Sequence, residues 1–225
     1  MRWTLKPQPK KEKVEKLAKE LQVNSAIASI LCQRNIETFE AAKNYFRPNL
    51  EQIHDPFLMK DMDVAVSRIE TAIANNENIL IYGDYDVDGT TAVSLVSSYL
   101  KTIYSNIATY IPDRYAEGYG VSYKGIDFAH DNDFSLIIAL DCGIKAIEKV
   151  AYATKKNIDF IICDHHKPGP EIPKAIAVLN AKRNDCSYPF DELCGCGVGF
   201  KLIQALGVSR HKTIEDFLPY LDLVA

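Results

Sequence analysis

Residues 79–91 read ILIYGDYDVDGTT, and the predictions of both fold and chemistry start from this stretch. The apolar run Ile79–Tyr82 is typical of a fully buried strand. Gly83 ends the run, and three aspartates follow at alternate positions: Asp84, Asp86 and Asp88. Two threonines and a helical pattern of apolar residues come next. The stretch therefore predicts a strand, an acidic turn and a helix in direct succession.

The three aspartates allow two interpretations. Like charges this close repel one another, and a fold keeps them at a buried strand end only when a cation lies beside them. Carboxylate oxygens suit Mg²⁺ and Mn²⁺. The alternative is an acidic turn that caps a helix, and three aspartates alone favour neither interpretation. An EF-hand loop fits less well, because the glycine comes one position early and no Glu closes a twelve-residue loop.

The composition is that of an ordinary globular protein. The 225 residues are 47% hydrophobic and 25% charged, and no apolar run approaches the roughly 20 residues of a membrane span. The basic start lacks the apolar core of a signal peptide, which predicts a cytoplasmic protein. The six cysteines have no disulfide-framework spacing, and Cys194-Gly-Cys196 is too tight for a zinc knuckle, so buried thiols are expected. A net charge of −4 implies that any nucleic acid would be held by local groups and metal ions.

The chain is predicted to begin with a helical arm over residues 1–50, followed by a larger domain over residues 51–225. The arm's helices are expected over Lys10–Leu21, from Asn24 or Ser25 to Cys32, and over Phe39–Phe46. Through Arg47 the arm holds ten Lys and Arg against five Glu, which suits solvated helical faces or contact with a polyanion. The chain stops in an apolar pattern, which is typical of a piece of a longer protein.

The larger domain alternates short apolar runs with helical patterns. After a helix over Met59–Ile73, strands are expected near Ile79–Tyr82, Ile107–Ile111, Leu136–Leu140, Phe160–Cys163 and Ile176–Leu179. The helices between and after them are expected over Thr91–Tyr104, Tyr123–Ala129, Lys145–Lys155 and Val198–Leu206. This alternation predicts an α/β fold in which a parallel five-stranded sheet is covered by helices on both faces.

Polar residues follow four of the predicted strands directly. They are Asp84, Asp86 and Asp88 after the first strand, Pro112-Asp113-Arg114 after the second, Asp141-Cys142-Gly143 after the third, and Asp164-His165-His166 after the fourth. Each group alone is explained by a helix cap or a surface turn. Because the carboxyl ends of parallel strands meet at one edge of the sheet, the groups are expected to converge there, where such sheets bind ligands.

Aspartates combined with imidazole favour Mn²⁺ over Mg²⁺, and phosphoester hydrolysis commonly uses two such ions about 3.5–4 Å apart, bridged by one carboxylate. Arg114 offers a planar fork for a phosphate, with a salt bridge to Asp113 or Glu117 as the alternative. A glycine-rich helix start with Gly197, Gly199 and Lys201 is a further candidate for phosphate binding, although close helix packing explains its glycines nearly as well.

At these motifs the chain resembles the DHH phosphoesterase superfamily. The motifs that carry the resemblance are YGDYDVDGTT at 82–91, IPDR at 111–114, EGYG at 117–120, LDCG at 140–143 and DHH at 164–166. The stretches HDPF at 54–57, KDM at 60–62 and GVGFK at 197–201 resemble the RecJ branch, the single-strand-specific 5′→3′ DNA exonucleases of repair and recombination. The resemblance runs from about Trp3 to Ala225.

The resemblance implies a five-stranded parallel sheet, two Mn²⁺ (or Mg²⁺) ions and stepwise release of 5′-mononucleotides from the 5′ end of single-stranded DNA. It implies Asp86, Asp88, Asp141 (the bridging carboxylate) and His165 as metal ligands, with Asp84 and Asp222 as further candidates. His166 would face the scissile phosphate, and Asp164 would orient the histidine pair. His165 and His166 are expected to point apart because they are adjacent after a strand. A single-strand-binding protein or a helicase would be further partners, and no membrane is involved.

The sequence departs from the family at Cys194 and Cys196, where small or branched apolar residues are usual, which leaves the phosphate role of this helix start open. The family's next carboxylate normally follows Leu221–Ala225, so the chain alone is expected to be a poor nuclease unless Asp222 serves. The alternatives are another DHH enzyme, acting on pyrophosphate, cyclic dinucleotides or short oligonucleotides, and a non-catalytic replication module of the same fold. The presence of Asp86, Asp88, Asp141, His165 and His166 favours an enzyme, and the helical arm and the His54 stretch favour the RecJ branch.

Overall fold

The computed structural model describes residues 4–224, which form two compact units that divide between Ile53 and His54. The boundary lies three residues after the one expected from the sequence. The first unit contains α1 (Lys11–Leu21), α2 (Ser25–Gln33), α3 (Phe39–Phe46) and the short 3₁₀ helix η1 (Leu50–Gln52). Asn24 rather than Ser25 caps α2, because its side chain accepts from the backbone N–H of Ala26. In residues 4–224, no helix has both the length and the apolar character needed to cross a membrane.

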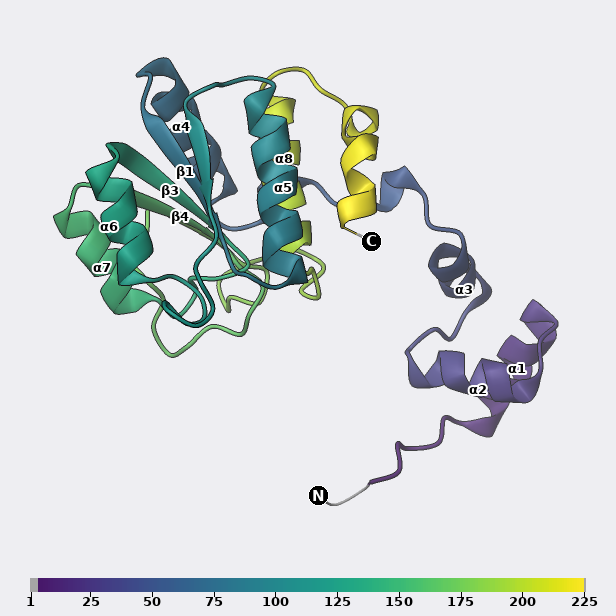
Figure 1. Ribbon diagram of the computed structural model, residues 1–225. Coiled ribbons are helices and arrows are strands. Elements are labelled where there is room, and N and C mark those ends of the chain that lie inside the picture. The colour runs from purple at the N-terminus through teal and green to yellow at the C-terminus, as the bar shows by residue number, and fades with distance from the viewer. Residues whose placement is uncertain (1–3, 225) are drawn as a thin grey trace. The chain divides into compact units, whose positions relative to one another are not determined.

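The second unit is built on a parallel sheet of five strands, as predicted (Figure 1). The strands are β1 (Asn78–Gly83), β2 (Ile107–Tyr110), β3 (Phe134–Leu140), β4 (Asp159–Cys163) and β5 (Ala177–Leu179). Their spatial order is β2-β1-β3-β4-β5, so the chain leaves β1 to one side for β2 and returns to its other side for β3. The carboxyl ends of β1 and β3 therefore form the topological switch point, which is where such sheets bind ligands.

Helices cover both faces of this sheet (Figure 1). On one face α4 (Met62–Ala74), α5 (Val87–Lys101) and α8 (Gly195–Val208) share a core with alternate strand residues such as Ile79 and Ile138. On the other face, α6 (Tyr123–Asp131) and α7 (Ile147–Lys155) pack on the strand residues that point the opposite way, such as Leu80 and Ile137. Because β1, β3, β4 and β5 are covered on both sides, they are buried at almost every position, and this produced the short apolar runs in the sequence. The edge strand β2 is only partly buried.

The two helices that border the strand ends begin earlier than the sequence pattern predicted. Helix α5 begins at Val87 instead of Thr91, because the side chain of Asp86 accepts from the backbone N–H of Gly89 at 3.0 Å and caps the helix. Helix α8 begins at Gly195 instead of Val198. The 3₁₀ helix η2 (Pro56–Leu58) delays α4 to Met62, and the 3₁₀ helix η3 (Ile214–Leu223) follows α8. As a result, Asp88 lies in the first turn of α5 and Asp86 caps the helix, while Asp84 precedes it.

Candidate metal centre

The carboxyl ends of β1, β3 and β4 bring together the acidic and histidine residues singled out in the sequence. Nε2 of His165 lies 3.2 Å from Oδ1 of Asp141 and 3.6 Å from Oδ2 of Asp88. Asp141, His165 and His166 each offer a ligand atom, and these atoms lie within 4.8 Å of one another. Asp86 and Asp88 belong to the same cluster, because their negative charges act on Asp141. The predicted convergence at one sheet edge is therefore what the fold produces.

Asp141 is the most constrained carboxylate of the cluster. Its side chain is 1% exposed, and Oδ1 has no hydrogen-bond partner although His165 is near. Burial, followed by the charges of Asp88 and Asp86, raises the pKa of Asp141 to about 8. Its backbone also lies in the left-handed region, with φ of 59°. A buried carboxylate with a free oxygen among other carboxylates is costly for the fold, and a divalent cation would remove that cost.

Asp84 shows the same pattern one strand away. It is fully buried, Oδ1 accepts from the backbone N–H of Tyr85 at 2.9 Å, and Oδ2 has no partner. Burial is the main reason that the pKa of Asp84 is raised, and the charge of Asp86 adds to it. Two buried carboxylates with free oxygens fit a cation site better than an acidic turn that only caps a helix. The donor set of carboxylates plus imidazole suits Mn²⁺ or Mg²⁺.

Asp88 is held by the start of α8. Its Oδ2 accepts from the backbone N–H of Gly195 at 2.7 Å, and its Oδ1 accepts from that of Cys196 at 2.6 Å. The positive end of this helix therefore binds a carboxylate of the protein itself. The backbone N–H of Gly197 donates to Sγ of Cys194, and Gly199 packs against Val96 of α5. These contacts contradict the expectation that Gly197 and Gly199 bind phosphate and support the helix-packing alternative.

In the sequence Gly195 is only the first residue of the candidate phosphate-binding helix start, and the structure gives it a specific place beside Asp141. A Cβ atom at this position would lie 2.4 Å from Oδ1 of Asp141. Only glycine therefore allows α8 to begin against Asp141 while its N–H holds Asp88. The glycine-rich start was visible in the sequence, but the carboxylate that requires it lies 54 residues earlier in the chain.

We expect Gly195→Ala to lower Mn²⁺ affinity about 10–100-fold, the range seen when the groups that orient metal ligands are removed. The added methyl group must displace either Asp141 or the first turn of α8. Calorimetric titration of the chain with Mn²⁺ measures the effect. Gly169→Ala is the matched control, because a Cβ atom there meets its nearest atom at an ordinary 3.4 Å. Equal affinities of the two variants would contradict the role of Gly195.

Asp164 holds His165 and His166 in place through hydrogen bonds. Its Oδ1 accepts from the backbone N–H groups of His165 and His166 and lies 2.8 Å from Nδ1 of His166, while Oδ2 accepts from the N–H of Ile144. Because a carboxylate only accepts hydrogen bonds, Nδ1 of His166 carries the proton. The centroids of the two imidazole rings lie 4.5 Å apart, with the rings edge to face. The expectation that they point apart was wrong, because the chain has already left the strand after Cys163.

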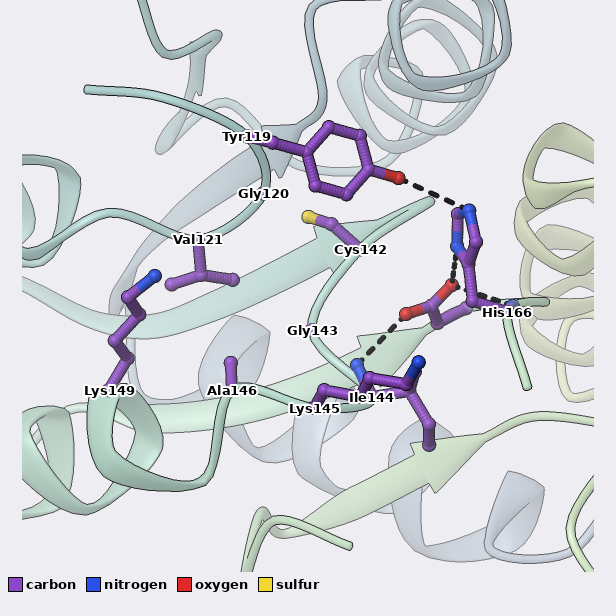
Figure 2. A pocket seen from close by; sticks show the side chains of 11 residues that line it. Tyr119, Gly120, Val121, Cys142, Gly143, Ile144, Lys145, Ala146, Lys149 and His166 are labelled. Carbon is purple, nitrogen blue, oxygen red and sulfur yellow. Dashed lines mark hydrogen bonds and ion pairs between the residues drawn. The ribbon is translucent and has the colours of Figure 1, made fainter. Parts of the chain in front are cut away.

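Tyr119 completes this arrangement, and the sequence analysis gave it no individual role. Its hydroxyl lies 3.1 Å from Nε2 of His166, which must accept because Nδ1 donates to Asp164 (Figure 2). The ring of His166 is thus fixed at both nitrogens. Burial raises the pKa of Tyr119, so the phenol keeps its proton and remains a donor. The EGYG motif contained this residue, but nothing local in the sequence indicates its partner.

Arg114 lies at the same edge and is exposed. No ion pair joins it to Asp113 or Glu117 within residues 4–224. The carboxylate of Glu117 accepts instead from the hydroxyls of Tyr110 and Ser122 and from the backbone N–H of Asp113. The guanidinium of Arg114 lies over the ring of Tyr85, 5.2 Å from its centroid. The salt-bridge alternative is therefore not what the structure contains, and the fork of Arg114 is open.

Two other candidates lie elsewhere. Lys201 is 4% exposed, and its Nζ donates to the backbone oxygen of His54 at 2.7 Å and to Gln204 at 2.9 Å. Burial lowers the pKa of Lys201 to about 8. Its ammonium joins α8 to the His54 turn, which contradicts the expectation that it binds phosphate. Asp222 is exposed in η3 and is not among the grouped ligand atoms of Asp141, His165 and His166.

Comparisons with known proteins agree with this architecture. The model of the DHH family, N-terminal domain, matches residues 78–225. The chain is 41% identical over 99% of its length to the single-stranded-DNA-specific exonuclease RecJ of Bacillus subtilis, and 33% identical over 74% of its length to that of Escherichia coli. It spans 29% and 31% of those relatives.

A solved structure supports the same assignment. The crystal structure of exonuclease RecJ bound to manganese superimposes with a TM-score of 0.66 at 29% identity. The superposition covers 74% of this chain and 42% of that one. The family model covers the whole sheet and every residue of the acidic and histidine cluster. The chain belongs to the DHH family.

Proposed function

We propose that this chain forms the metal-binding part of a phosphodiesterase that removes 5′-mononucleotides stepwise from the 5′ end of single-stranded DNA. The observation that carries the proposal is the buried, unpaired oxygen of Asp141 among carboxylates and imidazole at the switch point of the sheet. Asp86, Asp88, Asp141 and His165 would hold two Mn²⁺ or Mg²⁺ ions, with Asp84 as a further ligand or as an orienting group. The substrate follows from the relatives, which are named single-stranded-DNA-specific exonucleases.

Two divalent ions at this site would activate water as a nucleophile and offset the negative charge that develops on the phosphate. The chain's own residues position the substrate. Arg114 would bind two oxygens of a phosphate with its fork. His166, whose Nδ1 donates to Asp164, could take up a proton at Nε2 in place of the hydrogen bond from Tyr119 and donate that proton to a phosphate or leaving oxygen. Tyr119 keeps the imidazole of His166 aimed at the same place.

The direct test incubates the protein with 5′- or 3′-labelled DNA, single- or double-stranded, in the presence of Mn²⁺. The proposal expects mononucleotides from the 5′ end of single strands only. Release of product from cyclic dinucleotides, pyrophosphate or very short oligonucleotides alone would identify another type of DHH enzyme. Binding of single strands with no cleavage, in a chain shown to hold Mn²⁺, would identify a binding module.

The proposed substrate also predicts where the protein works. Single-stranded DNA forms during repair and recombination, where a helicase exposes it and a single-strand-binding protein covers it. We therefore propose a cytoplasmic enzyme that meets one of these proteins on its substrate. Co-sedimentation on DNA covered by a single-strand-binding protein, compared with bare DNA, tests whether the chain binds that partner.

Arg114→Lys is expected to lower kcat/KM on single-stranded DNA about tenfold, because an ammonium cannot form the bidentate contact. Steady-state kinetics at saturating Mn²⁺ measures the loss. Arg210→Lys is the matched control, since the fork of Arg210 binds Glu70 and should affect only thermal stability. An unchanged kcat/KM in Arg114→Lys would show that Arg114 does not bind the substrate.

A further inference from the structure

A cavity of about 210 Å³ lies beside the ring of His166 (Figure 2). Its walls come from Tyr119–Val121, from Cys142–Ala146 after β3, from Lys149 of α7, and from Asp164 and His166 after β4. All these segments belong to the second unit. The proposed function uses Tyr119, Asp164 and His166, but it gives no role to the rest of the cavity.

The shape and lining of the cavity suit one small ring. Val121, Cys142 and Ile144 are buried and give it an apolar lining. Its volume is below the roughly 300–1,000 Å³ of pockets that hold a drug-sized ligand. An apolar cavity of this size next to a phosphate site suits a single sugar or base, because each nucleotide presents an apolar ring face between its charged phosphates.

The charge of the cavity is opposite to that of the metal centre. Lys145 and Lys149 line it, and neither forms an ion pair within the described part of the chain. The one carboxylate in the lining is Asp164, whose two oxygens are already bonded to the histidine pair and to Ile144. The acidic cluster would therefore bind cations, whereas the two lysines of the cavity would bind an anion. His166 contacts both.

We propose that Lys145 and Lys149 bind the phosphate next to the one being cleaved, and that the sugar or base between these phosphates occupies the cavity. This inference rests on the proposed function, because it takes the scissile phosphate to lie at His166 and Arg114. In a single strand the neighbouring phosphate is one nucleotide away. Two lysines at the cavity hold it by charge, without reading sequence, as a nuclease that degrades any strand requires.

The test neutralises both lysines in the 225-residue chain. The double variant Lys145→Gln/Lys149→Gln should raise the Kd for a fluorescent 5′-phosphorylated oligothymidylate about tenfold, and its salt slope should fall by about 0.7, because one phosphate fewer is neutralised. Fluorescence anisotropy at several salt concentrations measures both quantities. Calorimetric Mn²⁺ affinity should stay unchanged, and Lys145→Arg/Lys149→Arg should restore DNA binding. The control Lys155→Gln/Lys174→Gln removes two exposed charges outside the cavity.

Two altered substrates distinguish the two phosphates that could be bound: an oligothymidylate with a 5′-hydroxyl in place of its 5′-phosphate, and one with an uncharged methylphosphonate at the linkage that follows the scissile one. Removing the charge of the correct phosphate should weaken binding to the native chain and add nothing in the glutamine double variant. Sensitivity at the 5′-terminal phosphate would place the released nucleotide in the cavity, and sensitivity at the next internal linkage would place the remaining strand there.

Three outcomes would overturn this assignment: an equal effect in the control pair, an unchanged Kd in the double variant, or a loss of Mn²⁺ affinity. The proposed function fails differently. If the native chain binds Mn²⁺, and binds single strands through these lysines, but the protein never cleaves DNA, the phosphate site stands and the nuclease proposal falls. If the protein cleaves single strands and the double variant cleaves and binds them equally well, the nuclease proposal stands and the phosphate site falls.

Discussion

Asp141→Asn is expected to abolish binding of Mn²⁺ at the proposed two-ion site, because it removes a carboxylate that lies beside His165 and is coupled to the charges of Asp86 and Asp88. A bridging carboxylate serves both ions, and without it two cations would face each other poorly screened. Cleavage of single-stranded DNA should be lost with the metal. Asp84→Asn, which changes a carboxylate one strand away, should reduce Mn²⁺ affinity less.

The same substitution should stabilise the chain when no metal is bound. In the unfolded chain Asp141 releases its proton near pH 3.8, whereas in the fold burial raises its pKa to about 8. Between these values the folded chain holds a proton that the unfolded chain has released, so the free energy of unfolding falls as pH rises. Asn carries no titratable proton, and its amide can donate to the neighbouring carboxylates. The gain at alkaline pH should be on the order of a few kcal/mol.

Thermal melts of the EDTA-treated chain at pH about 5 and about 9 measure this effect, with the native chain and Asp141→Asn compared at each pH. The Tm of the native chain should fall more between the two values than that of the variant. Saturating Mn²⁺ should raise the Tm of the native chain and leave the variant unchanged. A variant that still gains stability from Mn²⁺, or an Asp84→Asn change that loses more metal than Asp141→Asn, would show that Asp141 is not the bridge.

The sheet could be predicted from the sequence because four of its strands, β1, β3, β4 and β5, are buried at almost every position. Such strands appear as short apolar runs, and Ile79–Tyr82 is the clearest of them. The convergence of Asp84, Asp141 and His165 also followed, since parallel strands end at one edge. The predicted strand boundaries differ from the observed ones by at most two residues. The starts of α5 and α8 were placed too late, because a cap such as Asp86 depends on backbone geometry that apolar periodicity does not report.

The errors concern contacts between residues far apart in the chain. Lys201 looked like a phosphate ligand because it follows a glycine-rich helix start, yet its ammonium bonds the backbone of His54, 147 residues away. Gly195 and Tyr119 were passed over because their partners, Asp141 and His166, are 54 and 47 residues away. Local patterns in the sequence show which residue types are present, whereas packing decides which distant residues each of them contacts. Glycines that appear to cradle a ligand can therefore serve helix contact instead.

His165→Ala and His166→Ala should have different effects, although the two residues are adjacent. His165 lies among the carboxylates, 3.2 Å from Asp141, so its loss should weaken Mn²⁺ binding. His166 is held between Asp164 and Tyr119 and is expected to act on the substrate instead. Its loss should leave Mn²⁺ affinity unchanged and reduce kcat by about 10²–10⁴, the usual contribution of a positioned acid or base. Mn²⁺ titration and single-turnover cleavage of 5′-labelled single strands measure the two properties separately.

His166→Asn provides the control for structural damage. Its amide can still donate to Asp164 in place of Nδ1, so the loop should keep its conformation, but the amide cannot carry a proton to the substrate. A histidine that only orients Asp164 would be replaced well by Asn, and kcat would recover. A histidine that transfers a proton would not be replaced, and kcat would stay low in His166→Asn. Equal loss of Mn²⁺ affinity in His165→Ala and His166→Ala would instead make both residues metal ligands, which their shared proximity to Asp141 also allows.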